Sequence, residues 1–509
     1  MTRGERLRYF LLVGMWLFCL IYFWTWWLQK DHVFQISTFL ISSLIIAWST
    51  VIPGYFFYFV GRMSRFNPEI PIPNLKVAMV VTKAPSEPFS IVEKTLRAML
   101  SQKHPHDTWL ADEDPSEETT KWCANNGVYL STRKGVHGYH RHTWPRRTRS
   151  KEGNLAYFYD TYGYEKYDIV VQMDADHIPT GNYLEEMIRP FADPKVGYVS
   201  APSICSANAS GSWSARGRLH AEAIMHGPLQ AGHSRNFAPL CIGSHYAVRT
   251  KALKEIGGVG PELAEDHSTT LMMNALGWRG IHAYDAFAVG DGPLTFADCM
   301  TQEFQWSRSL MIILCVWLPK YWRRLPLRLK LQFLFSELWY PLFSFTMLLG
   351  LSLPVAAILL RNPLVSVTYT DFLLHAIPIS ASILAVVAFL KNHRYLRPTN
   401  APMLSWESVL FVLARWPWSL YGSFAGLFYS VFKKVPHFRV TPKGKSESYV
   451  PYRVLTPYLA IIALSLIPVL IRTDAGNANG YFFFLFLNVF FYAILVSAVF
   501  ILHRRETAK

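Results

Sequence analysis

Two aspartates stand one residue apart at the end of an apolar run, in the stretch VQMDADHIPT that begins at Val171. Asp174 and Asp176 put two carboxylates at the mouth of a strand, with His177 directly after the second. Carboxylate oxygens there suit a hard divalent cation, because such ions prefer oxygen ligands. Taken alone, however, the pattern fits an ordinary capped turn better than a metal site.

Other residues capable of chemistry lie on both sides of this pair. Lys151 stands upstream in SKEGNLAY, and the acidic pair Glu265 and Asp266 stands downstream in LAEDHST. A box of polar and aromatic residues then follows in QEFQWSRS: Gln302, Gln305, Trp306 and Arg308. A cation on carboxylates, a nearby lysine and a separate carboxylate would suit a nucleotide diphosphate and a general base.

These residues need a scaffold, and the middle of the chain, roughly residues 66–308, alternates strand and helix patterns. We expect strands at 75–82, 108–114 and 167–176, and helices at 88–102 and 153–163. This alternation predicts an α/β domain with a mostly parallel sheet. Ligands collect at the carboxyl ends of such strands, where Asp112 and the Asp174 to Asp176 pair would lie.

Both ends of the chain are strongly apolar. The composition is 51% hydrophobic and 15% aromatic, unlike that of an ordinary soluble enzyme. Crossing a bilayer takes about 20 apolar residues. Six runs qualify: 9–27, 34–60, 331–360, 372–390, 454–471 and 481–502. The first has a basic start but no small-residue cleavage site, so we interpret it as an uncleaved anchor.

A further apolar stretch, 406–432, decides the topology. If it lies in the membrane interface, all the Lys- and Arg-rich segments fall on one side, as cytoplasmic segments do. We therefore predict six spans and a cytosolic middle. The net charge of +15 is concentrated beside the spans, so we expect contact with membrane lipids and no nucleic-acid partner. Six cysteines without metal-like spacing fit a reducing compartment.

The order of Asp112, Asp174-x-Asp176, Glu265-Asp266 and a Q-x-x-x-W box resembles the processive family 2 glycosyltransferases, which include cellulose, chitin and hyaluronan synthases. The stretch FRVTPKG resembles the FxVTxKG gating loop of cellulose synthase catalytic subunits, which narrows the likeness to that branch. The matching gating-loop residues are Phe438, Val440, Thr441 and Lys443.

The resemblance implies a GT-A-type α/β domain inserted between transmembrane helices of a bacterial-type inner membrane, with the catalytic domain in the cytosol. We expect two transmembrane helices in 1–62, the glycosyltransferase domain in 63–308 and an interface helix in 309–330. Two further spans would follow in 331–391, an interfacial helix with the gating loop in 392–453, and two spans with a short cytosolic tail in 454–509.

The resemblance also assigns donor-side roles. The uridine contacts would be Thr82, Glu87 and Asp112, although VTKAPSEP has about two more residues than the family pattern PTYNEP. Lys151 would meet the diphosphate and Asp174 the nucleotide or the metal. Asp176 and His177 would ligate Mg²⁺ or Mn²⁺. Gln302, Gln305 and Arg308 would complete the donor site, with Gln305 in place of the usual arginine and Arg308 supplying the missing charge.

On the acceptor side, the resemblance makes Asp266 the general base, with Glu265 beside it. The alternative for Asp266 is a helix N-cap, which is the commoner role for an aspartate at such a position. CIGSHYAV resembles the family's FCGS segment, so Cys241 and Gly243 would border the acceptor sugar; tight core packing is the alternative. Trp306 would stack on a sugar ring, or be an ordinary core residue.

These residues predict an inverting transferase that adds a hexose, best taken as β-linked glucose, from a UDP-sugar to the nonreducing end of a growing polysaccharide and secretes it through its own spans. A hyaluronan- or chitin-type synthase, a nonprocessive transferase acting on a lipid, and a nucleotide-binding transporter or receptor are the alternatives. The seven residues after Leu502 cannot hold a cyclic-dinucleotide-binding PilZ domain, so we expect any such regulation through an accessory subunit.

Overall fold

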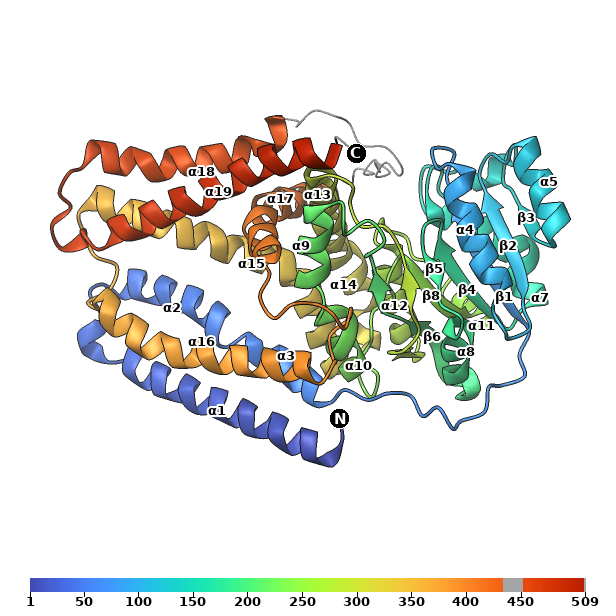
Figure 1. Cartoon of the computed structure of the whole chain (residues 1–509), viewed down its shortest axis with the longest axis horizontal. Helices are drawn as coiled ribbons and strands as arrows, with labels where there is room; N and C mark the ends of the chain where they lie inside the picture. Colours follow the sequence, from blue (N-terminus) through green and yellow to red (C-terminus); the bar gives the residue numbers. More distant parts are fainter. Residues whose placement is uncertain (434–451, 508–509) are drawn as a thin grey trace.

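The computed structural model describes residues 1–433 and 452–507. A bundle of long helices lies on one side and an α/β domain on the other, with short helices between them (Figure 1). Both chain ends contribute helices to the bundle, and the α/β domain comes from the middle of the chain. The α/β domain is therefore inserted between helices from the two ends of the chain, as predicted.

Three parallel strands form the centre of the main sheet. β1 (Val77–Lys83) lies between β2 (Asp107–Asp112) and β4 (Ile169–Asp174). Their central side chains are mostly apolar and almost all residues are buried, as expected for strands covered on both faces. Lys83 is in register with Asp112, and Thr82 with Asp174, so the polar ends of all three strands meet at one edge.

The whole sheet has the strand order β3-β2-β1-β4-β8-β6-β9. The outer strands are β3 (Tyr129–Ser131), β6 (Val196–Ser200), β8 (His245–Arg249) and β9 (Arg279–His282). β8 is antiparallel to β4 and β6, while the other pairs are parallel. A small second sheet comprises β5 (Ile178–Pro179), β10 (Ala288–Val289) and β7 (Ser203–Ile204). The mostly parallel sheet is confirmed, with one reversed strand.

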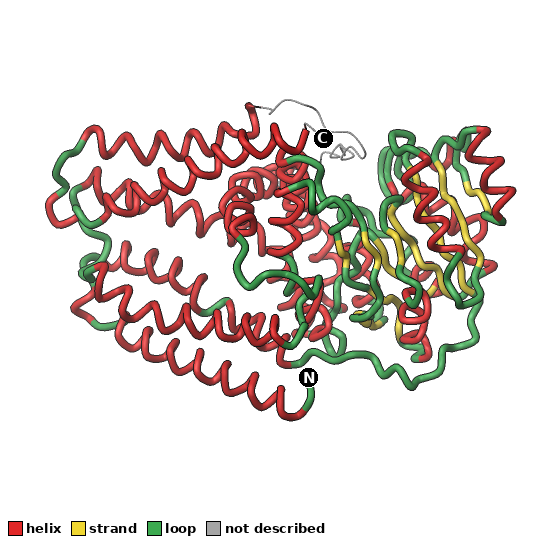
Figure 2. Tube along the Cα trace, in the orientation of Figure 1, coloured by secondary structure: helices red, strands yellow, loops and turns green. Residues whose placement is uncertain are grey.

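Helices cover the sheet and continue toward the bundle (Figure 2). In chain order they include α4 (Phe89–Leu100), α5 (Glu117–Asn126), α6 (Lys151–Phe158), α8 (Tyr183–Ile188), α9 (Trp213–Ala221), α10 (Gln230–His233), α11 (Thr250–Glu255), α12 (Glu265–Ala275), α13 (Phe296–Ile312) and α14 (Leu318–Tyr321). The predicted helix at 88–102 is α4. The one predicted at 153–163 is α6 followed by a π-helical turn over Tyr159–Gly163.

In the part of the chain that the structure describes, six helices are long and apolar enough to cross a membrane. They are α1 (Arg3–Trp27), α2 (Ile36–Thr50) joined to α3 (Pro53–Gly61), α15 (Leu327–Leu360), α16 (Tyr369–Asn392), α18 (Tyr452–Ile471) and α19 (Tyr481–Thr507). Pro53 begins α3, where it starts a helix but cannot continue one. The six predicted spans are confirmed by length and composition.

The stretch at 406–432 forms α17 (Trp406–Val431), which is not one of these six helices. α17 packs closely on α13 through two glycines one helical turn apart. A Cβ at Gly422 would overlap Ser307, and one at Gly426 would lie 2.5 Å from the carbonyl oxygen of Arg308. Two helices this close need small residues at the contact. α17 is thus attached to the helix that carries the Q-x-x-x-W box.

We expect cysteines at Asn400 and Lys433 to react with a membrane-impermeant maleimide from the same side of the membrane. Both positions are exposed and they flank α17, which should lie along the interface without crossing. The exposed Cys315 would first be replaced by serine to remove background labelling. Labelling from opposite sides would mean that α17 spans and that the topology has seven helices.

Candidate active site

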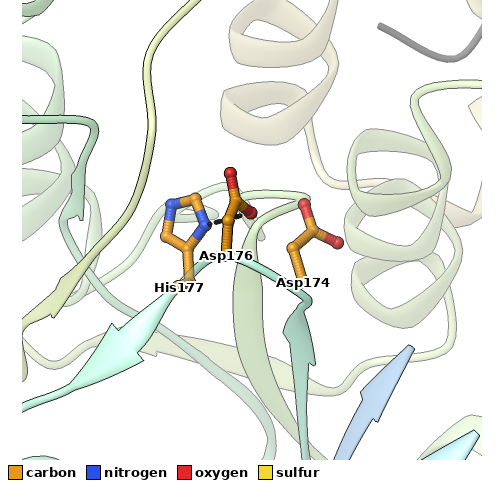
Figure 3. Close-up of side chains that lie close together, drawn as sticks. All are labelled: Asp174, Asp176 and His177. Carbon is orange, nitrogen blue, oxygen red and sulfur yellow. Dashed lines mark hydrogen bonds and ion pairs between the residues drawn. The ribbon is translucent and has the colours of Figure 1, made fainter. Parts of the chain in front are cut away.

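Asp174, Asp176 and His177 come together at the carboxyl end of β4 (Figure 3). One ligand atom from each lies within 4.8 Å of the others, and the Nδ1 atom of His177 is 3.2 Å from an oxygen of Asp176. Two carboxylates and an imidazole can hold a divalent cation such as Mg²⁺ or Mn²⁺. The sequence-predicted metal ligands are therefore brought together.

The surroundings of His177 fit a ligand held in one orientation. Its Nε2 atom lies 3.3 Å from the hydroxyl of Ser203, which accepts a hydrogen bond from Ser244 at 2.8 Å. The ring packs directly on Gly290, where any Cβ would overlap it. A second group that orients a metal-ligating histidine is usual in metal sites. Gly290 was missed by the sequence analysis, because nothing local connects it with His177.

Lys151 lies between the carboxylate of Asp174 and that of Glu265, and it contacts both. Its Nζ atom lies 2.6 Å from Asp174 and 3.8 Å from Glu265, and it donates to the carbonyl oxygen of Gly243. Burial disfavours the charged ammonium, but Asp174 and Glu265 outweigh that effect and raise the pKa of Lys151. Lys151 is therefore a retained cation at the centre of the site, and its predicted contact with a diphosphate stays a prediction.

The acidic pair opens α12. The helix begins at Glu265, and its N-cap residue is Ala264, so Asp266 is not the cap. Carboxylates in the first turn lie at the positive end of the helix dipole, which stabilises their charge. Asp266 is partly exposed and accepts a hydrogen bond of 2.7 Å from the N–H of His267. A Cβ at Gly243 would lie 3.2 Å from Asp266, so this backbone packs on the pair.

Both carboxyl groups of the pair hold protons more tightly than usual. Burial raises the pKa of Glu265 to about 8, although Lys151 acts in the opposite direction. Burial also raises the pKa of Asp266, while the neighbouring His267 and the N–H groups of His267 and Gly243 lower it. A carboxylate with a pKa nearer neutrality is a better proton acceptor. The pair is thus suited to take a proton from a hydroxyl group.

A membrane helix holds the residue next to Asp266. The Nε2 atom of His267 lies 3.0 Å from a carboxylate oxygen of Glu337, which is fully buried on α15. Burial opposes charge on His267, but Glu337 outweighs burial and raises the pKa of His267. The sequence analysis missed this pair. A lone carboxylate within a long apolar run was the available signal, because such groups seldom lack a buried partner.

We expect Glu337→Gln to move the acid limb of the pH–rate profile to higher pH. Without the Glu337 carboxylate, the buried His267 loses the group that favours its charged form. Asp266 then loses the neighbouring cation that lowers its pKa, so less Asp266 is ionised at a given pH. Initial rates against pH measure the shift. The control is Ser344→Ala, a change at a buried residue of the same helix, which should leave the acid limb in place. An acid limb that does not move in Glu337→Gln would contradict the effect of Glu337 on Asp266 through His267.

The Q-x-x-x-W box is organised by Arg218 on α9, which the sequence analysis missed. Its guanidinium donates a hydrogen bond of 2.7 Å to Gln302 and lies 4.1 Å from the ring centroid of Trp306. Arg218 is also paired with Glu222 at 3.3 Å. A cation over an indole face fixes the ring plane. Trp306 is partly exposed, so it can offer apolar surface as well as pack.

The other two members of the box are more deeply buried. Gln305 is 4% exposed and Arg308 is 6% exposed. The guanidinium of Arg308 lies 5.4 Å from the ring of Phe304 and 5.7 Å from that of Tyr429 on α17. Arg308 therefore takes part in the α13 to α17 contact. Its role toward a leaving diphosphate, and that of Gln305, stay predictions.

The predicted uridine contacts lie around the end of β1. The Thr82 hydroxyl is 3.5 Å from the carbonyl oxygen of Met173, and Glu87 accepts a hydrogen bond of 2.8 Å from the Ala84 N–H. Asp112 is fully buried with its carboxylate 3.1 Å from the ammonium of Lys83. Lys83 was not anticipated. It neutralises Asp112, whose contact with a nucleotide stays a prediction.

Cys241, predicted to border the acceptor sugar, and the predicted gating loop remain to be placed. Cys241 is 2% exposed and belongs to a core cluster with Tyr246 and Val248, while its N–H donates to the Thr270 hydroxyl at 2.9 Å. This burial favours the packing alternative for its side chain. The gating-loop residues lie outside the described part of the chain, so their predicted role is unchanged: Phe438, Val440, Thr441 and Lys443.

Comparison with known families agrees with this geometry. The family model described as Glycosyl transferase family group 2 matches residues 169–495, which include β4, the acidic pair and the Q-x-x-x-W box. The chain belongs to this glycosyltransferase family. The candidate active site of a glycosyltransferase therefore comprises the metal trio (Asp174, Asp176 and His177) and the acidic pair (Glu265 and Asp266).

Among curated proteins, this glycosyltransferase is similar to cellulose synthases. It is 23% identical over 400 residues to the UDP-forming cellulose synthase catalytic subunit of Pseudomonas fluorescens, covering 75% of this chain and 50% of that protein. The corresponding subunit of Xanthomonas axonopodis is 24% identical over 351 residues, covering 65% and 46%. The chain therefore spans about half the length of these relatives.

Among solved structures, this glycosyltransferase is similar to a mannosyltransferase from Pyrobaculum calidifontis in complex with GDP-mannose and Mn²⁺. The two are 14% identical with a TM-score of 0.49, covering 77% of this chain and 99% of that chain.

Proposed function

We propose that this protein is a membrane-embedded polysaccharide synthase that transfers glucose, in β-linkage, from UDP-glucose to the nonreducing end of a growing glycan. One observation supports this most strongly: Lys151 joins the Asp174 metal trio to the Glu265 and Asp266 pair. A donor diphosphate and an acceptor hydroxyl need these two kinds of group on opposite sides of one reacting carbon. The similarity to cellulose synthases supports the choice of UDP-glucose and of a processive reaction.

In the proposed reaction, the acceptor hydroxyl attacks the anomeric carbon on the face opposite the diphosphate. The new carbon–oxygen bond forms as the bond to the phosphate oxygen breaks, and UDP leaves with that electron pair. Asp266 takes the hydroxyl proton, and its partial exposure lets it reach the acceptor. The single displacement inverts the anomeric configuration, which gives a β-linked product from an α-linked donor.

Charge on the departing UDP must be neutralised as it develops. Lys151 remains cationic at this position and needs no reorganisation to act there. A divalent cation bound by Asp174, Asp176 and His177 would supply further positive charge for the diphosphate. The ion pair of Lys151 with Asp174 also keeps the metal ligand and the lysine at a fixed separation.

Repeated addition requires the product to move by one sugar and leave the site. Trp306, held in place by Arg218, would support the terminal sugar ring. The close contact of α13 with α17 places the Q-x-x-x-W box beside the bundle, through which the glycan would be secreted. We propose that the catalytic domain faces the cytosol of a bacterial-type cell, where UDP-sugars are made.

A product assay tests the proposal. The full chain in membrane vesicles would be supplied separately with radiolabelled UDP-glucose, UDP-N-acetylglucosamine and UDP-glucuronate. We expect a high-molecular-weight product from UDP-glucose that a β-1,4-glucanase degrades. A polymer from another donor would assign a different synthase, label in a lipid extract would indicate a nonprocessive lipid transferase, and no transfer from any donor would contradict the proposal.

A further inference from the structure

A cavity of about 390 Å³ lies where the end of α12, the segment 234–237 and the start of α15 meet. It is separate from the metal trio and the acidic pair, and no part of the proposed reaction uses it. Its lining contains four arginines: Arg235, Arg279, Arg324 and Arg328. None of the described residues that line it carries a carboxylate. The cavity is therefore strongly positive.

The arginines are only partly neutralised by the rest of the protein. Arg279 is paired with Asp193, and Arg328 donates a hydrogen bond of 2.6 Å to the carbonyl oxygen of Asn236. Arg235 and Arg324 are exposed, and neither guanidinium has a hydrogen bond or ion pair with the side chains and backbone that the structure describes. Gathering cations without counter-ions is unfavourable unless an anion joins them. Guanidinium groups bind phosphate oxygens in paired hydrogen bonds.

The cavity opens at the depth expected for lipid headgroups. Arg324 and Arg328 flank Leu327, the first residue of the α15 span. The chain just before them is rich in tryptophan and tyrosine, which mark the membrane–water interface: Trp317, Tyr321 and Trp322. On α15 itself, Leu327 is 70% exposed and Leu331 is 57% exposed. An apolar surface therefore runs from the arginines into the membrane-spanning part of the helix.

We propose that this cavity binds the phosphate-bearing headgroup of an anionic phospholipid, whose acyl chains lie along Leu327 and Leu331. A free phosphate ester shares the headgroup chemistry and could also meet the arginines. The exposed leucines favour the lipid, since a soluble ligand would gain nothing from them. Basic pockets beside membrane helices on the cytoplasmic side bind such headgroups in other proteins.

The bound lipid would join two elements of the active site. Residues 274–277, at the end of α12, line the cavity together with the start of α15. α12 begins with the acidic pair, and α15 carries Glu337, which holds His267. A headgroup between the two helices would stabilise their packing. This inference concerns lipid binding and does not depend on which sugar the enzyme transfers.

Lipid binding can be measured on the full chain in nanodiscs of phosphatidylcholine, with or without phosphatidylglycerol. The test variant is Arg235→Gln/Arg324→Gln/Arg328→Gln, in which every substituted side chain is exposed. The matched control removes three exposed arginines from the start of α1, which are not among the residues that line this cavity: Arg3→Gln/Arg6→Gln/Arg8→Gln. Native mass spectrometry counts retained phosphatidylglycerol, and thermal unfolding gives the stabilisation that it confers.

We expect the unmodified chain to retain phosphatidylglycerol and to unfold at a higher temperature in its presence. The cavity variant should lose both effects while the α1 control keeps them. Each arginine at an anionic surface contributes about fivefold in affinity, so the triple change should weaken binding roughly a hundredfold. Equal lipid retention and stabilisation in the cavity variant would overturn the proposal.

A second arm separates lipid from soluble phosphate. Inorganic phosphate and UDP would be added in phosphatidylcholine nanodiscs, where we expect no stabilisation that depends on the three arginines. The contrary result is that inorganic phosphate stabilises the protein as much as phosphatidylglycerol does, and only when the three arginines are present. That result would assign the cavity to a soluble anion and overturn the proposal of a lipid ligand. If the triple variant fails to fold, Arg324→Gln alone gives the same comparison, with about fivefold weaker binding expected.

Discussion

Asp266→Asn is expected to reduce turnover by about a hundredfold to ten-thousandfold while the affinity for UDP is retained. Asparagine keeps the size of the side chain and can still accept the hydrogen bond from the His267 N–H. It cannot take a proton from the acceptor hydroxyl. Initial rates of sugar transfer and calorimetric titration with UDP measure the two quantities separately.

A structural role for Asp266 gives a different result. A residue that only stabilises the first turn of a helix tolerates asparagine well, because the interaction of a carboxylate with the helix dipole contributes only about 0.3 to 1 kcal/mol to stability. Asp371→Asn, in the first turn of α16, is the matched control and should leave transfer unchanged. Near-normal transfer by Asp266→Asn would remove the general base from the proposed mechanism and leave the family assignment intact.

The pattern of strands could be predicted because each strand is a local feature. β1 and β4 are continuous apolar runs, and both end in polar residues at the point where the chain turns. Once the sheet is known to be parallel, its strands must end at the same edge. The meeting of Asp112 and Asp174 around β1 follows from this topology alone.

Contacts between distant segments could not be predicted in this way. Arg218 and Trp306 meet because α9 and α13 pack, and neither helix shows this in its own sequence. The same holds for His267 and Glu337, which connect the catalytic domain to α15. Only for Glu337, a carboxylate within a long apolar run, does the sequence indicate a residue that needs a partner. Only the fold identifies that partner.

The helix cap alternative for Asp266 shows a different limit. Glu265 and Asp266 stand just before a helical pattern in the sequence. If Asp266 were the N-cap, Glu265 would lie outside the helix. In the structure both are inside it, and the N-cap residue is Ala264, without a side-chain hydrogen bond. The first turn is held in other ways: the Ala264 N–H donates to Ser309, and Gly243 packs on the acidic pair. Helix boundaries are uncertain by a residue or two in any sequence-based prediction.

These contacts also explain why the acidic pair lies between the sheet and the membrane helices. Lys151 attaches Glu265 to the carboxyl end of β4, and Glu337 attaches His267 to α15. The N-terminal turn of α12 therefore has an ionic link on each side. Movement of α15 relative to the sheet would change the position of Asp266. Such a link is one physical way for events in the membrane helices to affect Asp266, the proposed proton acceptor.

The metal trio leads to the other large expected effect: Asp176→Asn and chelation with EDTA should each abolish transfer while the protein remains folded in the membrane. Asparagine removes one of two carboxylates from a cation site, and cation binding here depends on negative ligands. Transfer should return to the chelated native enzyme, but not to the variant, when Mg²⁺ or Mn²⁺ is added back. Full activity in excess EDTA would contradict the metal assignment.

Gly290→Ala tests the same site without changing a ligand. An alanine Cβ would overlap the ring of His177 and force it from its present orientation. Displacing a group that orients a ligand typically weakens metal binding by about tenfold to a hundredfold. Gly181→Ala is the control, since a Cβ there meets open space. Electron paramagnetic resonance titration with Mn²⁺ gives the affinity directly, without any need for turnover. Equal Mn²⁺ affinities in the two variants would mean that His177 is not a ligand, and the site would then rest on Asp174 and Asp176 alone.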